Sequence, residues 1–556
     1  MDTIYMFAYP RRRVLTRIRR RSLLTGRSSP LALPRAAHFV RAPRPEKPRP
    51  LKCLSGQQVR MQFERQSGVF LHLTSLPGPH GIGDLGAGAR AFVDFLDRAD
   101  QSLWQFCPLG PTASIHGNSP YQSSSAFAGN PLLIDLRDLT DRGYLTEADT
   151  EPPDDFSGQQ VNYDRVTEFK EARLRDAYAA FEESASDADQ QSFTKFCERE
   201  AGWLDDYALF TALKAEFDDA GWMDWPDDIR TREPAAMERY QDDLADDIRY
   251  HKFVQWCFDS QWQALADYAA ERDIGLVGDL PIYVGLDSAD VWAYPEVFRL
   301  DDDHHPAEVA GVPPNPGDDG QRWGNPVYDW DALRANDYGW WVDRFERLFD
   351  LVDIARIDHF KGFDEFWSIP AEADDPAAGQ WRDGPGAHFF ETVRDRLGEL
   401  PFFVEDLGFL DESIVALRDE FGFPGMRVPQ YADWCEEGHM YQPMHYPESA
   451  VGYTSTHDTD TIVGYYRDLA DRQRDCLHYN LGTDGDEINW DLIEAVWNSN
   501  AIVAMTTMQD LLGLGSDTRF NVPGTATGNW QWRVTDTALD ADIAERLRRV
   551  TDRTIR

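Results

Sequence analysis

Four short apolar runs in this 556-residue chain end in carboxylates, the side chains that serve acid–base and nucleophilic catalysis. The runs span residues 274–279, 352–358, 402–406 and 451–458, and the Gly, Pro or polar residues beside them predict buried strands. In a β/α barrel the carboxyl ends of the strands carry the catalytic groups. Carboxylates that meet there from separate strands would suit cleavage of a glycosidic bond, which uses a pair of them.

Two pairs of nearby residues indicate how these carboxylates divide their roles. Arg356 and Asp358 are two residues apart, so on a strand both side chains point the same way. A guanidinium beside a carboxylate keeps it ionised, which favours a nucleophile; a structural ion pair at a strand end is the alternative. Glu405 and Asp406 are adjacent and face opposite sides of a strand, so only one of them enters a pocket directly. The spacing does not decide which.

Other side chains have the chemistry to bind a sugar. His457 and Asp458 follow the polar run 454–456 and would hydrogen-bond sugar hydroxyls, or form a metal or structural pair. Tyr121 and Trp323 lie in segments rich in Gly, Asn and Pro, which predict loops. An aromatic ring on a loop either offers a flat apolar face to a pyranose or packs against its own domain.

The periodic segments predict an α/β fold. Strands are expected at 68–73 and 103–106, with an amphipathic helix at 87–99 between them, and this order predicts a parallel sheet. Residues from about 164 to 250 are mostly charged with helical periodicity and too long for a crossover, which predicts a helical insertion. A crossover helix at 256–272 then leads into the strand at 274–279, whereas 301–326 has the composition of a loop.

The chain is strongly acidic, with a formal net charge of −42. Its basic residues are 48 arginines and only seven lysines, and this balance predicts adaptation to molar salt, with an ordinary acidic enzyme as the alternative. A nucleic-acid or other acidic partner is disfavoured because its phosphates would be repelled. The mean hydropathy of −0.54 and the lack of a long apolar run predict no membrane span.

The six cysteines are dispersed, without the spacing of metal ligands, at positions 53, 107, 197, 257, 435 and 476. In a chain of this length the simplest expectation is free, buried thiols in a reducing compartment, and therefore a cytoplasmic protein.

The first sixty residues reverse the charge of the chain. They hold 15 basic residues against two acidic ones, and they are rich in Pro and Arg without periodicity. A basic arm for nucleic acid, a targeting peptide and a translated upstream region are the alternatives; Met61, just before the first foldable segment, favours the last. In each case residues 1–60 are expected to be disordered and 61–556 to form the catalytic part.

Short motifs in a fixed order resemble those of one family, the amylomaltases or 4-α-glucanotransferases. Three of them contain residues discussed above: Arg356-Ile357-Asp358-His359-Phe360, Glu405-Asp406-Leu407-Gly408 and Thr456-His457-Asp458. The others span residues 74–78, 117–123, 278–284, 287–292, 320–326, 509–512 and 528–530. The resemblance covers roughly residues 66–535, and the shared order of all these motifs makes it specific.

The resemblance implies a (β/α)8 TIM barrel with inserted, largely helical subdomains. A helical insertion is expected at about 150–250 and a substrate-loop insertion at about 285–330. It further implies an enzyme that transfers α-1,4-glucan segments between malto-oligosaccharides, with no cofactor and no metal. A monomer or weak homo-oligomer is expected.

Roles for individual residues follow from the same motif positions. Asp358 is implied as the nucleophile, Glu405 as the general acid/base and Asp458 as the transition-state stabiliser. The residues implied at the reacting sugar are Arg356, His457 and Asp279, and the further substrate contacts are Tyr121, Trp323 and Asn529.

The chain departs from the family pattern at three places. Thr459 stands where the family usually has Asn, and Lys361 stands where it has Arg, which loses a planar fork. The segment 313–320 lacks the aromatic residues that the family commonly has there, so it offers no ring for stacking against the acceptor sugar. A plain α-glucan hydrolase and a non-catalytic glucan-binding protein are the alternative functions; a ladder of products from maltotriose distinguishes all three.

Overall fold

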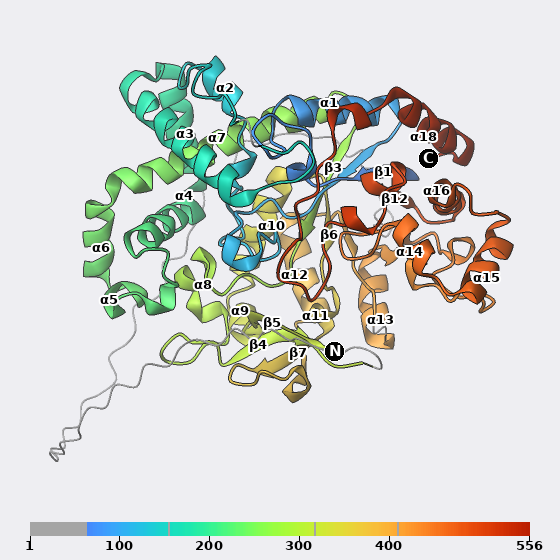
Figure 1. Ribbon diagram of the computed structural model, residues 1–556. Helices are drawn as coiled ribbons and strands as arrows, with labels where there is room; N and C mark the ends of the chain where they lie inside the picture. The colour runs from blue at the N-terminus through green and yellow to red at the C-terminus, as the bar shows by residue number, and fades with distance from the viewer. Residues whose placement is uncertain (1–63, 154–155, 316–318, 409–410) are drawn as a thin grey trace, which may run out of the picture. The chain divides into compact units, whose positions relative to one another are not determined.

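The computed structural model describes residues 64–153, 156–315, 319–408 and 411–556, so the disorder expected for 1–60 lies outside the described residues. Parallel strands close into a barrel in the spatial order β1-β12-β11-β10-β9-β6-β3-β2 (Figure 1). This order follows the chain around the barrel, which confirms the predicted (β/α)8 fold. The strands are β1 (Gln66–Phe70), β2 (Leu103–Gln105), β3 (Gly275–Leu280), β6 (Ile354–Ile357), β9 (Phe402–Val404), β10 (Gly425–Arg427), β11 (Ala450–Tyr453) and β12 (Val503–Thr507).

Helices alternate with these strands along most of the chain. The predicted amphipathic helix is α1 (Ala87–Arg98), which buries Phe92, Phe95 and Leu96. The others that alternate with the strands are α7 (Ala245–Ala270), α10 (Gly339–Leu351), α12 (Ala387–Leu397), α13 (Glu412–Phe421), α16 (Ile488–Asn498) and α18 (Ala541–Thr554). Within the described part of the chain, no helix combines the length and the apolarity needed to cross a membrane.

Strand alternation decides which residues face the barrel interior. Val277, Phe403 and Val451 belong to one small buried cluster inside the barrel, together with residues of β2, β10 and β12. Their neighbours Phe402 and Val404 belong to the larger core instead. Because side chains alternate, Glu405 continues the inward face that Phe403 begins. The same rule extends the inward face of Val277 to Asp279.

Two insertions leave the barrel. Between β2 and β3 the chain forms the helices α3 (Tyr163–Ser184), α4 (Asp187–Glu216), α5 (Asp227–Arg230) and α6 (Pro234–Asp243) (Figure 1). The loop predicted over 301–326 is wrong in part, because β4 (Glu308–Val312) and β5 (Gln321–Pro326) are strands. They belong to an antiparallel sheet of order β5-β4-β7-β8 with β7 (Glu365–Pro370) and β8 (Gln380–Asp383). Backbone pairing with distant β7 outweighs the local turn composition.

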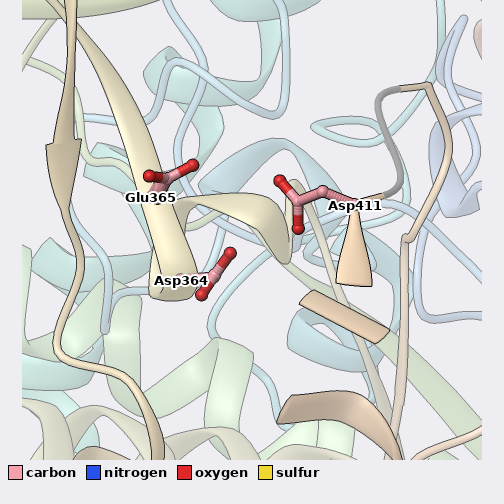
Figure 2. Close-up of side chains that lie close together, drawn as sticks. All are labelled: Asp364, Glu365 and Asp411. Carbon is pink, nitrogen blue, oxygen red and sulfur yellow. The ribbon is translucent and has the colours of Figure 1, made fainter. Parts of the chain in front are cut away.

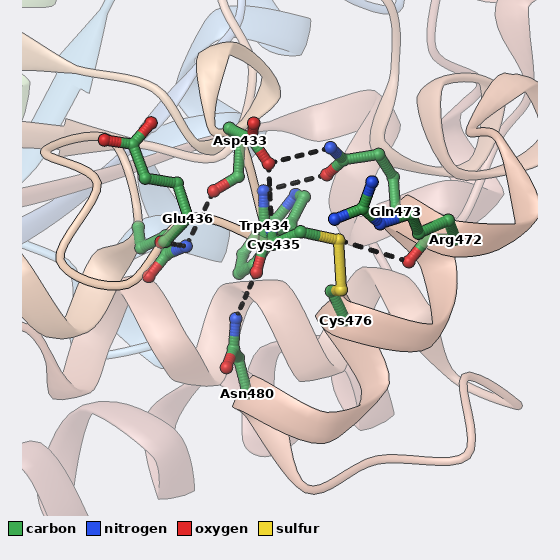
Figure 3. The surroundings of a disulfide bond; sticks show 9 residues. Asp433, Trp434, Cys435, Glu436, Arg472, Gln473, Cys476 and Asn480 are labelled. Atoms are coloured by element: carbon green, nitrogen blue, oxygen red, sulfur yellow. Dashed lines mark hydrogen bonds between the residues drawn. A yellow bond between two sulfur atoms is a disulfide. The ribbon is translucent and has the colours of Figure 1, made fainter.

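The expectation of free thiols is wrong for two cysteines. Cys435, in the segment after β10, forms a disulfide with Cys476 on α15 (Asp471–Leu481), as Figure 3 shows. Cys107 and Cys257 are free and buried as expected, and Cys197 is free but only partly buried. The pairing joins residues 41 apart in sequence, and nothing in their local sequence distinguishes them from the other cysteines.

Removing this disulfide should lower the thermal stability of the segment that contains Cys435. In the chain-entropy model, a loop of 41 residues gives a stabilisation between about 3 and 5 kcal/mol. The hydrogen bonds from Gln473 Nε2 to Asp433 Oδ1 and from Asn480 Nδ2 to the Trp434 carbonyl remain (Figure 3). We therefore expect the Cys435→Ser/Cys476→Ser variant to melt earlier in calorimetry. Dithiothreitol should lower the wild-type melting temperature and leave that of the variant unchanged; equal melting temperatures throughout would contradict a stabilising bond.

Candidate active site

One guanidinium joins three carboxylates at the carboxyl end of the barrel. Arg356, buried on β6, donates from Nη1 to both carboxylate oxygens of Asp279, at 2.8 and 2.7 Å. The same Nη1 donates to Asp358 Oδ1 at 2.8 Å, and Nη2 donates to Glu405 Oε2 at 3.2 Å. β3, β6 and β9 are neighbours in the barrel, so their ends bring these groups together. Asp358 and Glu405 therefore each accept a hydrogen bond from the same planar guanidinium group of Arg356.

The neighbours Glu405 and Asp406 have different surroundings. Glu405 lies on the side of Arg356, and its Oε2 also accepts from the backbone N–H of His359 at 2.7 Å. Asp406 is buried away from this side, and accepts from Arg418 and Arg427 and from the N–H of Met426. Strand parity thus separates the two, and the ion pairs of Asp406 are structural.

Burial sets the protonation of Glu405. Loss of hydration disfavours the charged carboxylate and is the largest influence on its pKa. The Arg356 guanidinium opposes this effect, while the negative charges of Asp358 and Asp458 add to it. The net result raises the pKa of Glu405 to about 7, so its carboxyl can carry a proton near neutral pH. When a partly buried acid of raised pKa lies beside an ion-paired Asp, the acid is suited to donate a proton and the Asp to act as the nucleophile.

His457 and Asp458 lie in the loop after β11, which ends at Tyr453, earlier than the apolar run suggested. His457 Nε2 is 3.1 Å from Asp458 Oδ2, and Asn521 Nδ2 donates to the other oxygen, Oδ1, at 2.7 Å. Burial by itself would raise the pKa of Asp458, but His457 and Asn521 hold it below its usual range. Burial by itself would lower the pKa of His457, and the Asp458 carboxylate outweighs it and raises that pKa. Asp458 is therefore held ionised beside the other carboxylates.

The two predicted aromatic contacts also lie at this site. Tyr121 donates its hydroxyl to Asp279 Oδ2 at 2.7 Å and stacks on the ring of His457, with centroids 4.8 Å apart. Trp323 lies on strand β5, not on a loop as its sequence predicted. Its ring meets that of His359, the residue after Asp358, edge to face at 4.9 Å. Both rings therefore border groups that contact the central carboxylates.

Asn529 has a different environment from the other predicted contacts. Its Oδ1 accepts from the Val522 N–H at 3.0 Å, and its Nδ2 donates to the Thr525 carbonyl at 3.0 Å. These bonds close the loop 522–529, which directly follows Asn521, the residue that contacts Asp458. The direct contact of Asn529 with substrate stays a prediction, and support of this loop is the role its bonds indicate.

Sequence reasoning missed two residues at the site. Asn521 was not singled out, although it lies near the 528–530 motif, and its contact with Asp458 depends on the loop fold. Tyr431 follows β10 in a short 3-10 turn, and its side chain is 49 % exposed. Burial and the charges of Glu405 and Asp458 raise the pKa of Tyr431 to about 12, so its hydroxyl shares the electrostatic environment of these two carboxyl groups. Its position at a barrel strand end was the signal available.

A closed (β/α)8 barrel with an ionised and a protonatable carboxyl group at its strand ends has the arrangement that glycoside hydrolases use. The particular family is defined by comparison with known proteins. The family model described as 4-alpha-glucanotransferase, glycoside hydrolase family 77, matches residues 71–539. The chain therefore belongs to the 4-alpha-glucanotransferase family.

Similar proteins cover nearly the same length. The 4-alpha-glucanotransferase of Synechocystis is 44% identical over 499 residues, 88% of this chain and 98% of the relative. That of Thermus thermophilus is 42% identical over 505 residues, 89% of this chain and all of the relative. The structure of an amylomaltase from Streptococcus agalactiae in complex with acarbose aligns with a TM-score of 0.85 and 36% identity. This alignment covers 89% of this chain and 100% of that one.

Proposed function

We infer that the protein is a 4-α-glucanotransferase, which moves an α-1,4-glucan segment from a donor to the 4-hydroxyl of an acceptor glucan or glucose. The observation that supports the residue roles best is the shared contact of Arg356 with Asp279, Asp358 and Glu405. It places Asp358 next to a carboxyl that can hold a proton. A double displacement that retains the anomeric configuration uses this pair.

In the first step, Glu405 gives its proton to the glycosidic oxygen and the bond from that oxygen to the anomeric carbon breaks. A carboxylate oxygen of Asp358 forms a new bond to the same carbon from the opposite side. The products are a free glucan end and a glycosyl ester of Asp358, and Glu405 is left as a carboxylate. This mechanism requires the carboxyl groups of Asp358 and Glu405 to lie roughly 5–5.5 Å apart.

In the second step, the 4-hydroxyl of an acceptor replaces the departed glucan. Glu405 takes the hydroxyl proton, the acceptor oxygen bonds to the anomeric carbon, and the ester bond to Asp358 breaks. Glu405 is protonated again and the carboxylate of Asp358 is restored. Transfer outcompetes hydrolysis when a bound sugar reaches the intermediate before water does.

We propose that the residues around this pair hold the reacting sugar. Asp458 would bind its hydroxyls and stabilise positive charge at the anomeric carbon, because it is held ionised by His457 and Asn521. His457 and Asp279 would contribute further hydroxyl contacts, and Tyr121 joins these two side chains. Trp323 would offer an apolar ring edge on the side of His359.

We also propose malto-oligosaccharides as the substrates of a monomeric or weakly associating enzyme of the cytoplasm. The neutral substrate class agrees with a strongly acidic chain that has no charge attraction for phosphates. The free thiols Cys107 and Cys257 agree with a reducing compartment, whereas the Cys435–Cys476 disulfide does not. Cell fractionation with an antibody and sedimentation of the purified protein test these two expectations.

Maltotriose as sole substrate tests the function directly. A glucanotransferase converts it into glucose together with a ladder of longer malto-oligosaccharides, visible by chromatography. A hydrolase would give only shorter sugars, and a binding protein would leave maltotriose unchanged. Either of the latter results would overturn the proposed function.

The pKa of Glu405 predicts the alkaline limb of the pH profile. The first step needs the protonated form, so kcat/KM should fall as pH rises through the pKa of about 7. The measurement is initial-rate kinetics on maltotriose between about pH 5 and 9 at constant salt. In Glu405→Gln, the residual activity should no longer show this limb. A wild-type kcat/KM that is flat across this range would contradict the assignment of Glu405 as the acid.

A further inference from the structure

Three carboxylates at the rim of the barrel converge on the ammonium group of Lys361. Its Nζ lies 3.2 Å from Asp364 Oδ2, 3.2 Å from Glu365 Oε2 and 2.6 Å from Asp411 Oδ2. Figure 2 shows the three carboxylates close together, with Asp411 approaching from a different segment. One oxygen of each lies within 4.8 Å of the others. The Lys361 side chain is 11% exposed, so this cation is largely withdrawn from water.

The cluster joins the two segments that leave the catalytic strands. Lys361 begins α11 (Lys361–Asp364), which follows β6 and Asp358. Asp411 follows β9 and Glu405 and caps α13, where its Oδ1 accepts from the N–H groups of Ser413 and Ile414. Its other oxygen, Oδ2, is the one that Lys361 contacts. The ammonium group of Lys361 and the Ser413 hydroxyl, which donates to Asp364 Oδ2 at 2.7 Å, therefore connect the segment after β6 to the start of α13.

These segments also meet at the proposed acid/base. The N–H of His359 donates to Glu405 Oε2 at 2.7 Å, and the N–H of Phe360 donates to the Glu405 carbonyl at 3.2 Å. His359 has a φ of 48°, in the left-handed region that is unfavourable for a non-glycine residue. Lys361 comes two residues after His359. Its contact with Asp411, the N-cap residue of α13, therefore holds the C-terminal end of the segment 358–361. A shift of the segment would move Asp358 and Glu405 relative to each other.

The negative charges of Asp364, Glu365 and Asp411 are balanced in part by the positive charge of the Lys361 ammonium group. Burial by itself lowers the pKa of Lys361, but the bonds to Asp411, Glu365 and Asp364 outweigh it and raise that pKa. Lys361 in turn lowers the pKa of Asp411. Without this cation, three carboxylates would repel one another at short range, in a chain that already carries a net charge of −42. The two segments would then separate or bind another cation.

We propose that Lys361 is a positioning residue for glucan transfer: its ammonium group holds the segments after β6 and β9 at the separation where Asp358 and Glu405 act together. This inference rests on the proposed function. It also predicts the occupant of a vacated cluster, because three carboxylate oxygens are ligands that Ca²⁺ or Mg²⁺ prefers. In the native chain the lysine ammonium occupies their centre.

The test compares Lys361→Met with Lys361→Arg and the control Lys252→Met, all assayed at molar KCl. Lys252 pairs with Asp205 in the helical insertion and serves as a lysine whose ion pair lies outside the barrel rim. We expect Lys361→Met to lower kcat for maltotriose disproportionation by about 10-fold or more with a nearly unchanged KM, because small misplacements of catalytic groups act on kcat. Lys361→Arg should recover most of the loss. Millimolar CaCl2 or MgCl2 should raise kcat of Lys361→Met alone.

A second variant covers a failure of Lys361→Met to fold. Asp411→Asn keeps a residue that caps helices well and replaces the carboxylate oxygen facing Lys361 with an uncharged amide NH2, so it should lower kcat several-fold without losing α13. Wild-type kcat in Lys361→Met or in Asp411→Asn would overturn the inference, as would an equal loss in Lys252→Met. A loss that neither Arg nor a divalent cation relieves would also overturn it. If the wild-type protein makes no product ladder from maltotriose, the proposed function is wrong. If it makes the ladder and the variants have the same kcat as wild type, only the proposed role of Lys361 is wrong.

Discussion

Asp358→Asn and Glu405→Gln are each expected to lower kcat for maltotriose disproportionation by several orders of magnitude while the protein stays folded. Both residues act in steps that the proposed mechanism cannot bypass. Each substitution keeps the size of the side chain and its hydrogen-bonding oxygen, so Arg356 retains a partner in both cases. The barrel core does not depend on them, since neither belongs to a buried apolar cluster. Stopped assays on purified variants, with circular dichroism as the folding check, measure this effect.

An activated donor separates the two roles. A maltosyl fluoride carries a leaving group that departs without a proton, so Glu405→Gln should still form the glycosyl ester with it. Asp358→Asn lacks the carboxylate that forms the ester and should stay inactive with either donor. Glu412→Gln, an exposed carboxylate at the start of α13, is the matched control and should retain full activity. A kcat above about a tenth of wild type in Asp358→Asn or Glu405→Gln would refute the assignment.

Dilute salt is expected to inactivate the enzyme through loss of tertiary structure. The chain carries a net charge of −42, and because the basic excess lies in the first sixty residues, the remainder is more acidic still. The Debye length is about 10 Å at 0.1 M salt and about 3 Å at 1 M, so only molar salt screens neighbouring surface carboxylates. Glucans are neutral, so salt should act on folding and not on substrate attraction. We expect activity to fall below a few tenths molar KCl and to be highest at molar salt.

Melting temperatures and initial rates at 0.1 M and 2 M KCl test this prediction, together with near-ultraviolet circular dichroism. Sucrose at the same osmolality is the control, because it favours burial without screening charge. Full recovery in sucrose would mean that screening is not the cause. Equal activity and equal melting temperature at both salt concentrations would show that the chain is not adapted to high salt.

Local patterns in the sequence predicted six of the eight barrel strands and the polar residues at the ends of four of them, but not β10 or β12. Apolar runs predict buried strands, and alternation places Phe403 and Glu405 on one face and Asp406 on the other. The spacing could not say which acidic residue enters the pocket, because both faces of a barrel strand are buried. The choice came from partners distant in sequence: Arg356 for Glu405, and Arg418 and Arg427 for Asp406.

Contacts between segments far apart in sequence were decided only by the tertiary structure. The Cys435–Cys476 pairing, the contact of Asn521 with Asp458 and the approach of Asp411 to Lys361 leave no mark in local periodicity. The strands β4 and β5 were also missed, since their Gly and Pro content resembles that of a loop until β7 supplies its backbone partners. Periodicity depends on neighbours along the chain, and so the sequence by itself determined the strongly periodic elements and the faces of their side chains. Ion pairs, caps and disulfides depend on distances across the fold, which exist only once the barrel has closed.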